Sequence, residues 1–183
     1  MDPGAVEVLV RDLMERPKQV ESVLAQSESI EEMTKAWSDV RDYFFLGRSG
    51  DFPVAMEGAL KLKEIAYVRA EGYAAGEMKH GPIALIEEGV VVVGVATDSH
   101  VTTKTLSNME EMRDRGGTIV LVAEEGEEVG AVADHVIRVP SGPDLLCTVT
   151  AVVPLQLLSY HVATAKGLDV DKPRNLAKTV TVE

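Results

Sequence analysis

Three charged residues in the segment 56–82 have the types and spacing needed to move a proton. Glu57, Lys61 and Glu64 are four and three residues apart, so on a helix they project within roughly 60° of one another. Most other positions of this helix are apolar, which is typical of a buried helix. Buried charges must be paired or used in chemistry. The series therefore predicts either a structural ion-pair stripe or a general base tuned by a neighbouring lysine.

The histidines differ in their local setting. His80 stands in a polar turn, directly before a Gly-Pro pair that can present its side chain, although a satisfied structural histidine is the commoner case. His100 is a weaker candidate near a strand end, and His135 and His161 are expected to be structural. No set of His, Cys, Asp and Glu has metal-ligand spacing, so we expect neither a metal nor any other cofactor.

A hydroxyl-rich segment is a candidate phosphate site. It contains Thr97, Ser99, Thr102 and Thr105 between an apolar run and a helix. Hydroxyls and free N–H groups at a helix N-terminus can hold a phosphate, but the same residues are ordinary caps and turn formers. Both interpretations remain open from the sequence.

The last residues, 169–183, combine charge with regular apolar spacing. Leu176, Val180 and Val182 surround Arg174 and Lys178, which predicts a tail that docks on the body of the protein. A lysine held under such a lid can lose its charge and attack a carbonyl group.

Four apolar runs must position these residues, and we expect them to be buried strands at 43–47, 90–96, 118–124 and 135–139. Helices are expected at about 4–38, 53–68, 99–115 and 144–167, with Pro17 interrupting the first. Apolar strands separated by helices predict a parallel sheet covered on both faces, a three-layer α/β/α sandwich. Ligands of such folds bind beyond the carboxyl ends of the strands, where segments 47–53 and 97–105 are expected.

Composition limits the classes of partner. The 183 residues fit one domain, and the net charge of −12 makes nucleic acid or an anionic membrane an unfavourable partner. A phosphorylated substrate is not excluded, because phosphate sites are local. Cys147 stands alone in an apolar run, which suits a core residue and a reducing compartment. The acidic N-terminus is no signal peptide and the apolar runs are too short to cross a bilayer, so we expect a cytoplasmic protein.

Three segments together resemble a known enzyme family. They are FLGRSGDFPVAMEGALKLKEIAYVRAEGYAAGEMKHGPIALI (45–86), MRDRGGTIVLVAE (112–124) and VPLQLLSYHVATAKGLDVDKPRNLAKTVTVE (153–183). They closely resemble glucosamine-6-phosphate synthase, the glutamine–fructose-6-phosphate aminotransferase (isomerising). The resemblance covers the second sugar isomerase (SIS) domain, residues 1–168, and the C-terminal active-site tail, 169–183. It implies a flavodoxin-like sheet, and a fragment without the glutaminase and first SIS domains that is inactive alone in the full reaction.

The resemblance implies a role for each candidate. Glu64 is similar to the base that moves a proton between C1 and C2 of the sugar, with Lys61 and Glu57 as charged companions. His80 resembles the ring-opening histidine that the family inserts into the other subunit's site, and Lys178 resembles the lysine that forms a Schiff base with the open-chain ketose. The substrate-binding residues that it implies are Glu57, Arg174 and Ala177.

One segment departs from the family pattern. In the first SIS domain the phosphate loop reads Ser-x-Ser-Gly-x-Thr-x-x-Thr; here Thr97, Ser99, Thr102 and Thr105 keep the hydroxyls, but His100 replaces the glycine. The second SIS domain of the family usually has no phosphate role, so these four residues stay only candidate phosphate ligands.

The leading hypothesis is the isomerase domain of an enzyme that converts fructose-6-phosphate and glutamine-derived ammonia to glucosamine-6-phosphate. We expect a homodimer with the missing domains as partners. The alternatives are a non-catalytic SIS module that binds a sugar phosphate, and a domain that serves only for dimerisation.

Overall fold

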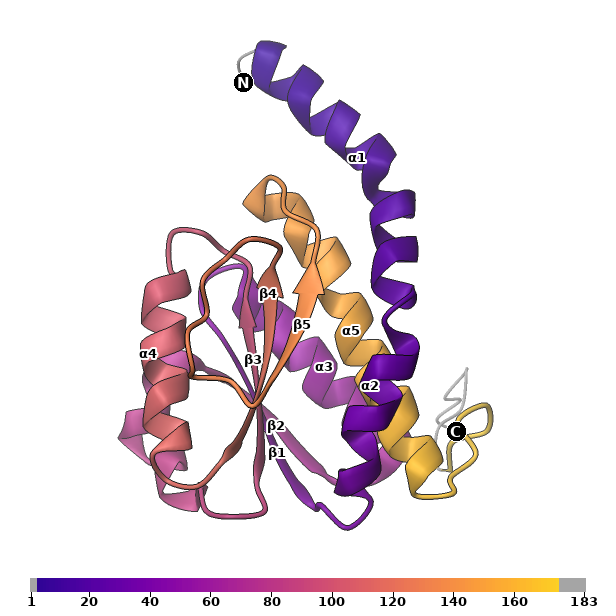
Figure 1. Ribbon diagram of the computed structural model, residues 1–183, viewed down its shortest axis with the longest axis vertical. Coiled ribbons are helices and arrows are strands. Elements are labelled where there is room, and N and C mark those ends of the chain that lie inside the picture. Colours follow the sequence, from indigo (N-terminus) through magenta and orange to yellow (C-terminus); the bar gives the residue numbers. More distant parts are fainter. Residues whose placement is uncertain (1–2, 175–183) are drawn as a thin grey trace, which may run out of the picture.

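The computed structural model describes residues 3–174, which form a five-stranded parallel sheet between helices (Figure 1). The strands are β1 (Asp42–Gly47), β2 (Arg69–Ala74), β3 (Val91–Ala96), β4 (Thr118–Glu124) and β5 (His135–Val139). Their order across the sheet is β2-β1-β3-β4-β5, and every neighbouring pair is parallel. The predicted parallel sandwich with flavodoxin-like order is thus confirmed, and its switch point lies between β1 and β3.

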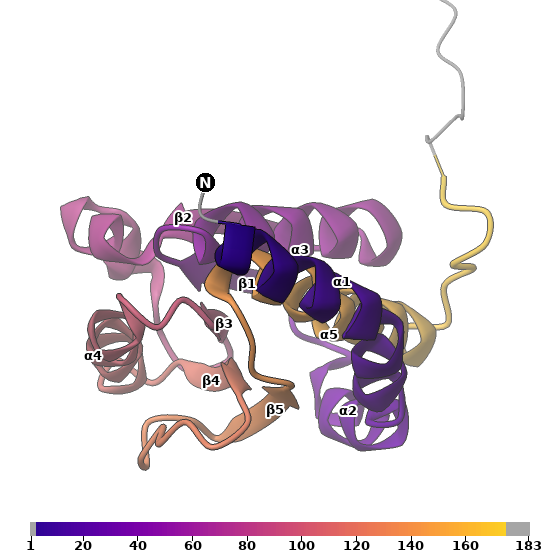
Figure 2. The same ribbon diagram turned by 90° about the horizontal axis from the view of Figure 1, so that it is seen from above.

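The helices form two unequal layers. The long helices are α1 (Pro3–Leu24), α2 (Ser27–Thr34), α3 (Asp51–Ala66), α4 (Thr102–Arg113) and α5 (Asp144–Ala165), and the short 3₁₀ helices are η1 (Lys35–Trp37), η2 (Ala75–His80) and η3 (Pro82–Leu85). Figure 2 shows the sheet between α4 on one side and α3 and α5 on the other. The first part of α1 extends beyond the body of the molecule (Figure 1).

The central strands bury both faces, so the core is divided into two clusters. Along β1, Tyr43 and Phe45 point into the cluster shared with α3 and α5. Phe44 and Leu46 point into the cluster shared with α4 and η2. This double burial explains why the strands read as continuous apolar runs without alternation. On the α3 side, a side chain at Gly58 would come within 3 Å of Phe45 and Leu155, so this glycine permits close packing.

The strand β2 was not anticipated from the sequence. We expected a helix to about residue 68 followed by a turn, whereas Arg69–Ala74 pairs with β1 as an edge strand. Only Ala70 of this strand is buried. An edge strand has one neighbour and half-exposed faces, so it lacks the apolar run that revealed the other four.

Pro17 was expected to separate two helices, and this is wrong because it lies inside α1. Proline removes the hydrogen bond to the carbonyl four residues earlier. That carbonyl belongs to Leu13, which is 54% exposed, so water can replace the missing donor.

The helix α5 corrects the expectation that no apolar segment reaches a membrane-spanning length. By length and composition it is the one helix of residues 3–174 that could cross a bilayer. More than half of the most apolar stretch of α5 is buried inside the protein, where α5 packs against α1, α2 and α3. Core helices of soluble proteins can have the same length and apolar composition, so these properties of α5 are weak evidence for membrane insertion.

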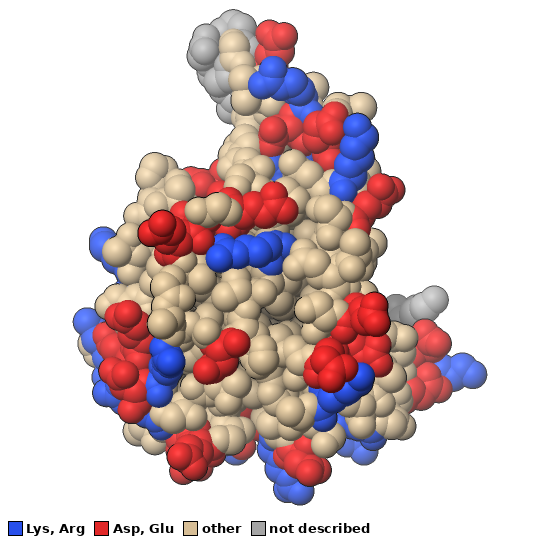
Figure 3. Space-filling model, in the orientation of Figure 1, with Lys and Arg blue, Asp and Glu red and all other residues tan. Residues whose placement is uncertain are grey.

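On the face seen in Figure 3, acidic and basic side chains are interspersed. This face carries no continuous basic patch of the kind that binds nucleic acid.

Candidate active site

The helix α3 joins the three charged candidates through one lysine. The Lys61 ammonium lies 2.7 Å from Oε2 of Glu64 and 3.7 Å from Oε1 of Glu57. These contacts are the i,i+3 and i,i+4 pairs that helical spacing allows. Lys61 therefore fixes the position of both carboxylates on the same face of the helix.

This stripe is half-exposed, which corrects the expectation of a buried one. The side chains of Glu57, Lys61 and Glu64 are 42%, 34% and 27% exposed. The helix buries the opposite side, where Ala55, Ala59 and Leu62 pack on the sheet and α5. Apolar residues that we assigned to a buried helix, Met56 and Leu60, instead stay 50% and 43% exposed. Within residues 3–174, this outward side of α3 is thus only partly covered.

A groove of about 590 Å³ runs beside the stripe, between α3 and the edge strand β2. Its lining residues are Pro53, Met56, Glu57, Ala59, Leu60, Lys63, Glu71, Gly72 and Tyr73. A mixed apolar and charged groove at an open sheet edge is typical of a surface that another domain or ligand covers.

Electrostatics distinguishes Lys61 from a nucleophilic lysine. The hydrogen bond to Glu64, with attraction from both carboxylates, raises the pKa of Lys61 above its usual 10.5. Lys61 is therefore charged near neutral pH and unsuited to imine formation, which needs a neutral amine. Its position suits a group that orients Glu64.

His80 is exposed and lies on the other face of the sheet. It is the last residue of η2, and its Nε2 is 4.0 Å from Oε2 of Glu77. The following Gly81 has φ of +152°, a conformation that favours glycine, and Pro82 begins η3. This agrees with the expected Gly-Pro presentation of the histidine. The structure does not bring His80 together with Glu64 of the same chain, because η2 packs in the α4 cluster and α3 in the other.

The beginning of the tail contacts the end of α3. The Arg174 guanidinium lies 4.1 Å from the ring centroid of Tyr67, three residues after Glu64. Ala177 and Lys178 lie outside the described residues.

The hydroxyl-rich segment uses its hydroxyl groups within the chain. Those of Thr102 and Thr105 donate to the backbone carbonyls of Asp98 and Val101, and that of Ser99 to the Asp144 carboxylate. The Thr97 hydroxyl donates to the Asp51 carboxylate. This arrangement favours the capping and turn role that the sequence also allowed, and the carboxylates nearby disfavour an anion.

Asp51 is a structural residue that sequence reasoning missed. It is 1% exposed and accepts hydrogen bonds from the backbone N–H groups of Thr97 and Asp98 as well as from the Thr97 hydroxyl. Burial raises its pKa, while these hydrogen bonds act in the opposite direction. Asp51 thereby joins the two loops at the switch point; its place after the Gly47–Gly50 turn was the available signal.

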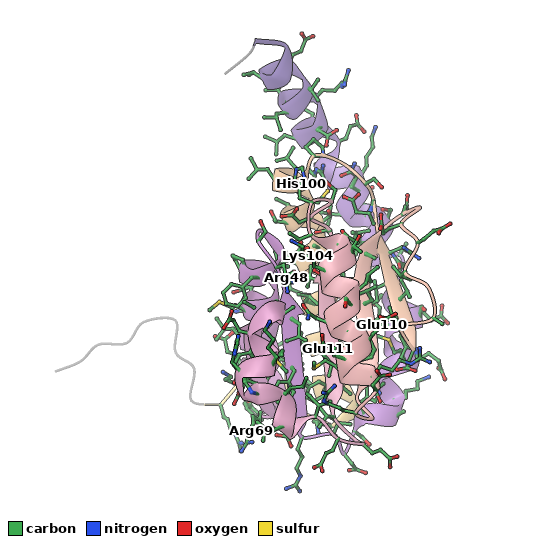
Figure 4. All side chains as sticks on the ribbon, turned by 90° about the vertical axis from the view of Figure 1, so that its left-hand side faces the viewer. Arg48, Arg69, His100, Lys104, Glu110 and Glu111 are labelled. Atoms are coloured by element: carbon green, nitrogen blue, oxygen red, sulfur yellow. The ribbon has the colours of Figure 1, made fainter. Side chains whose placement is uncertain are left out.

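The carboxyl edge of the sheet also holds Arg48. Its guanidinium nitrogens Nε and Nη2 both donate to Oδ1 of Asn108, at 3.1 and 2.9 Å. Figure 4 shows Arg48 with Lys104 and His100 toward this edge and Arg69 toward the other. His100 is exposed, 3.6 Å from Asp144. Among residues 3–174, no group of three His, Cys, Asp or Glu side chains could hold a metal ion.

The remaining histidines make structural contacts. His135 packs edge-on against the Trp37 ring. His161 is buried and hydrogen-bonds the Ser27 hydroxyl at 2.9 Å.

Comparison with known proteins gives consistent matches. The model of the SIS domain family matches residues 38–166. The glutamine–fructose-6-phosphate aminotransferase [isomerizing] of Chlorobaculum tepidum is 49% identical over 179 residues, covering 97% of this chain, and that of Thermus thermophilus is 51% identical over 176 residues, covering 96%. This chain spans 29% of the length of each relative.

A solved structure is similar over nearly the whole chain. It is the C-terminal domain of glucosamine-fructose-6-phosphate aminotransferase from Francisella tularensis, with a TM-score of 0.90 and 38% identity. The match covers 94% of this chain and 49% of that one.

Proposed function

The chain belongs to the SIS domain family, and from this premise we propose that it is the catalytic second SIS domain of a glutamine–fructose-6-phosphate aminotransferase. The observation that carries the proposal is the outward-facing Glu57–Lys61–Glu64 arrangement on α3, in a chain about half identical to such enzymes. The reaction converts fructose-6-phosphate and glutamine-derived ammonia to glucosamine-6-phosphate, an amino-sugar precursor on the route to UDP-N-acetylglucosamine, in the cytoplasm.

In the proposed mechanism, Glu64 is the general base of the ketose–aldose step. It removes a proton from C1 of the open-chain sugar and returns it to C2. Lys61 holds the Glu64 carboxylate at 2.7 Å and keeps its own charge. Glu57 anchors the other side of the lysine and contacts substrate. A proton transfer of this kind needs a positioned base and an electrophilic partner at the carbonyl, and does not need a metal.

The electrophilic partner in this proposal is an imine at C2 of the sugar. The Lys178 amine first condenses with the ketose carbonyl and releases water, and ammonia then displaces the Lys178 amine, so that the imine deprotonated at C1 carries the transferred nitrogen. Lys61, the alternative nucleophile on α3, is disfavoured because its ion pairs keep it protonated. Arg174 and Ala177 of the same tail are the proposed substrate contacts.

The site is completed by parts outside one copy of this chain. His80 is separated from Glu64 by the sheet, so we propose a homodimer in which His80 enters the partner's site and assists ring opening. The exposed Met56 and Leu60 beside the stripe support a covering domain, which excludes water from the reacting sugar. We assign this cover to the remainder of the full-length protein, including a phosphate-binding first SIS domain and a glutaminase domain.

The substitution Glu64→Gln in a full-length protein containing this chain tests the proposal. The amide keeps the shape of the side chain but cannot accept the proton, so isomerisation should fall about 10²–10⁴-fold, while calorimetry finds fructose-6-phosphate binding nearly unchanged. Glu110→Gln, at an exposed position of α4, is the matched control and should leave turnover unchanged. Near wild-type turnover of Glu64→Gln would show that the stripe is only structural, as in a non-catalytic SIS module.

A further inference from the structure

Tyr67, which follows the last residue of α3, has an unusual backbone conformation. Its φ and ψ angles of 55° and 35° are left-handed. Among residues 3–174 only one other non-glycine residue, Ser49, has positive φ. Glycine is the usual residue at this position of a helix end, and a bulky side chain there costs about 1–2 kcal/mol. Something beyond helix termination must therefore account for a tyrosine.

The side chain of Tyr67 holds Arg174 in two ways. Its hydroxyl accepts a hydrogen bond from the backbone N–H of Arg174 at 2.7 Å. Its ring lies under the Arg174 guanidinium at 4.1 Å, within the range of a cation–π contact. The two residues are 107 positions apart, so the contact joins the end of α3 to the segment that follows α5.

The path from α5 to this contact is fixed by other interactions. Leu168 and Val170 pack against the main core cluster. The Asp169 carboxylate then accepts hydrogen bonds from the backbone N–H groups of Asp171 and Lys172, at 3.0 and 3.2 Å. This turn directs the chain towards Tyr67, where Arg174 is bound. The position of Arg174, the last residue that the structure describes, is therefore set by Tyr67.

We propose that Tyr67 is a positioning residue that anchors the root of the C-terminal tail beside the end of α3. Its ring and hydroxyl both contact Arg174, so the anchor holds the start of the tail at the end of α3, the helix that carries Glu64. This inference rests on the proposed function, since it assigns Tyr67 the task of delivering Lys178 to the sugar that Glu64 deprotonates.

Helix termination alone is the competing explanation, and the substitution Tyr67→Gly distinguishes it from the anchoring role. Tyr67→Gly relieves the backbone strain, so a residue needed only to end α3 is replaced without loss of stability or activity. Tyr67→Phe keeps the ring but removes the hydrogen-bond acceptor. Tyr160→Phe, at a half-exposed site on α5, is the matched control.

The anchor is first measured by NMR on this chain. Tyr67→Phe should make the Arg174 amide exchange about fivefold faster and keep the ring-current shift of the Arg174 side chain. Tyr67→Gly should both speed the exchange of the Arg174 amide and remove the ring-current shift of the Arg174 side chain. Its free energy of urea unfolding should be no lower than that of wild type. Tyr160→Phe should change neither. An Arg174 amide and side-chain signal unaffected by Tyr67→Gly would overturn the anchor.

The catalytic consequence is measured in a full-length protein containing the chain. Tyr67→Gly should lower kcat and the rate of borohydride trapping on Lys178 about tenfold, with unchanged binding of fructose-6-phosphate. For Tyr67→Phe, both rates should lie between those of wild type and Tyr67→Gly. Wild-type kcat and trapping in Tyr67→Gly would overturn the positioning role and leave the proposed function standing. If wild type traps nothing on Lys178, the assignment of Lys178 fails, and an unchanged kcat in Tyr67→Gly would still refute the anchor's role.

Discussion

Glu64 and His80 lie on opposite faces of one β-sheet. Glu64 stands on α3, whose Leu62 packs with Tyr43 and Phe45 of β1. His80 ends η2, whose Met78 packs with Phe44 and Leu46, the residues of β1 that point to the other face. The sheet therefore separates the two side chains within a single copy. The proposed site therefore takes Glu64 from one copy of the chain and His80 from another, an arrangement that a two-fold dimer would contain twice.

Mixing two inactive variants should restore activity if the site is shared. In a full-length protein containing this chain, Glu64→Gln and His80→Ala are each expected to be inactive. A heterodimer of the two has one site with both defects and one intact site, so random re-association of equal amounts should recover about a quarter of wild-type turnover.

The control for this mixture uses two residues of the same face. A mixture of Glu64→Gln and Lys61→Met places one defect in every site, because both residues come from α3 of one copy. It should stay inactive. Equal recovery in both mixtures, or none in the first, would contradict the cross-subunit site.

Borohydride should trap the sugar on the tail lysine rather than on α3. In the proposed reaction the Lys178 amine condenses with the ketose carbonyl and releases water, and borohydride then adds hydride to the C=N bond. Peptide mass mapping should find the adduct on Lys178, and Lys178→Arg should trap none because guanidinium stays protonated. Lys61 should remain unmodified because its pKa is raised by Glu64. An adduct on Lys61 would identify it as the nucleophile instead.

Asp51 should be more important for stability than its short side chain suggests. Asp51→Ala leaves two buried N–H groups without their acceptor, so we expect a loss of about 2–4 kcal/mol in the free energy of urea unfolding. Asp51→Asn can still accept both N–H bonds with its oxygen and donate to the Thr97 hydroxyl, and should lose less than about 1 kcal/mol. The exposed Asp39→Ala is the control, and equal losses in the two Asp51 variants would refute this role.

The same site has a defined pH dependence. Because burial raises the pKa of Asp51 above 3.8, the unfolded chain ionises first as pH rises. The difference in the free energy of urea unfolding between wild type and Asp51→Asn should therefore be largest in acid and should shrink above pH 3.8.

Acidification should weaken the contact between α2 and α5. Burial lowers the pKa of His161 below 6.5, so the unfolded chain takes up this proton at a higher pH than the folded one. The free energy of unfolding should thus fall as pH drops below 6.5, by at most about 1.4 kcal/mol per pH unit. Urea titrations at several pH values should show a smaller slope for His161→Gln, which keeps a partner for Ser27. An identical slope would assign the pH dependence to other groups.

The sequence alone determined four of the five strands and the shared helix face of three charged residues. Continuous apolar runs identified β1, β3, β4 and β5 because strands buried on both faces leave no room for polar residues. Helical spacing placed Glu57, Lys61 and Glu64 on one face, since residues three and four apart are neighbours on any α-helix. These are local properties, fixed by backbone geometry.

The tertiary structure decided which of these groups meet. The edge strand β2 had too little apolar character to be seen in the sequence, and its position sends η2 back over the opposite face from α3, which separates His80 from Glu64. The outward, half-exposed setting of the stripe and the contact of Tyr67 with Arg174 depend on how α3 packs and where the chain goes after α5. Contacts between residues far apart in the chain depend on packing across the whole fold, and no local pattern encodes them.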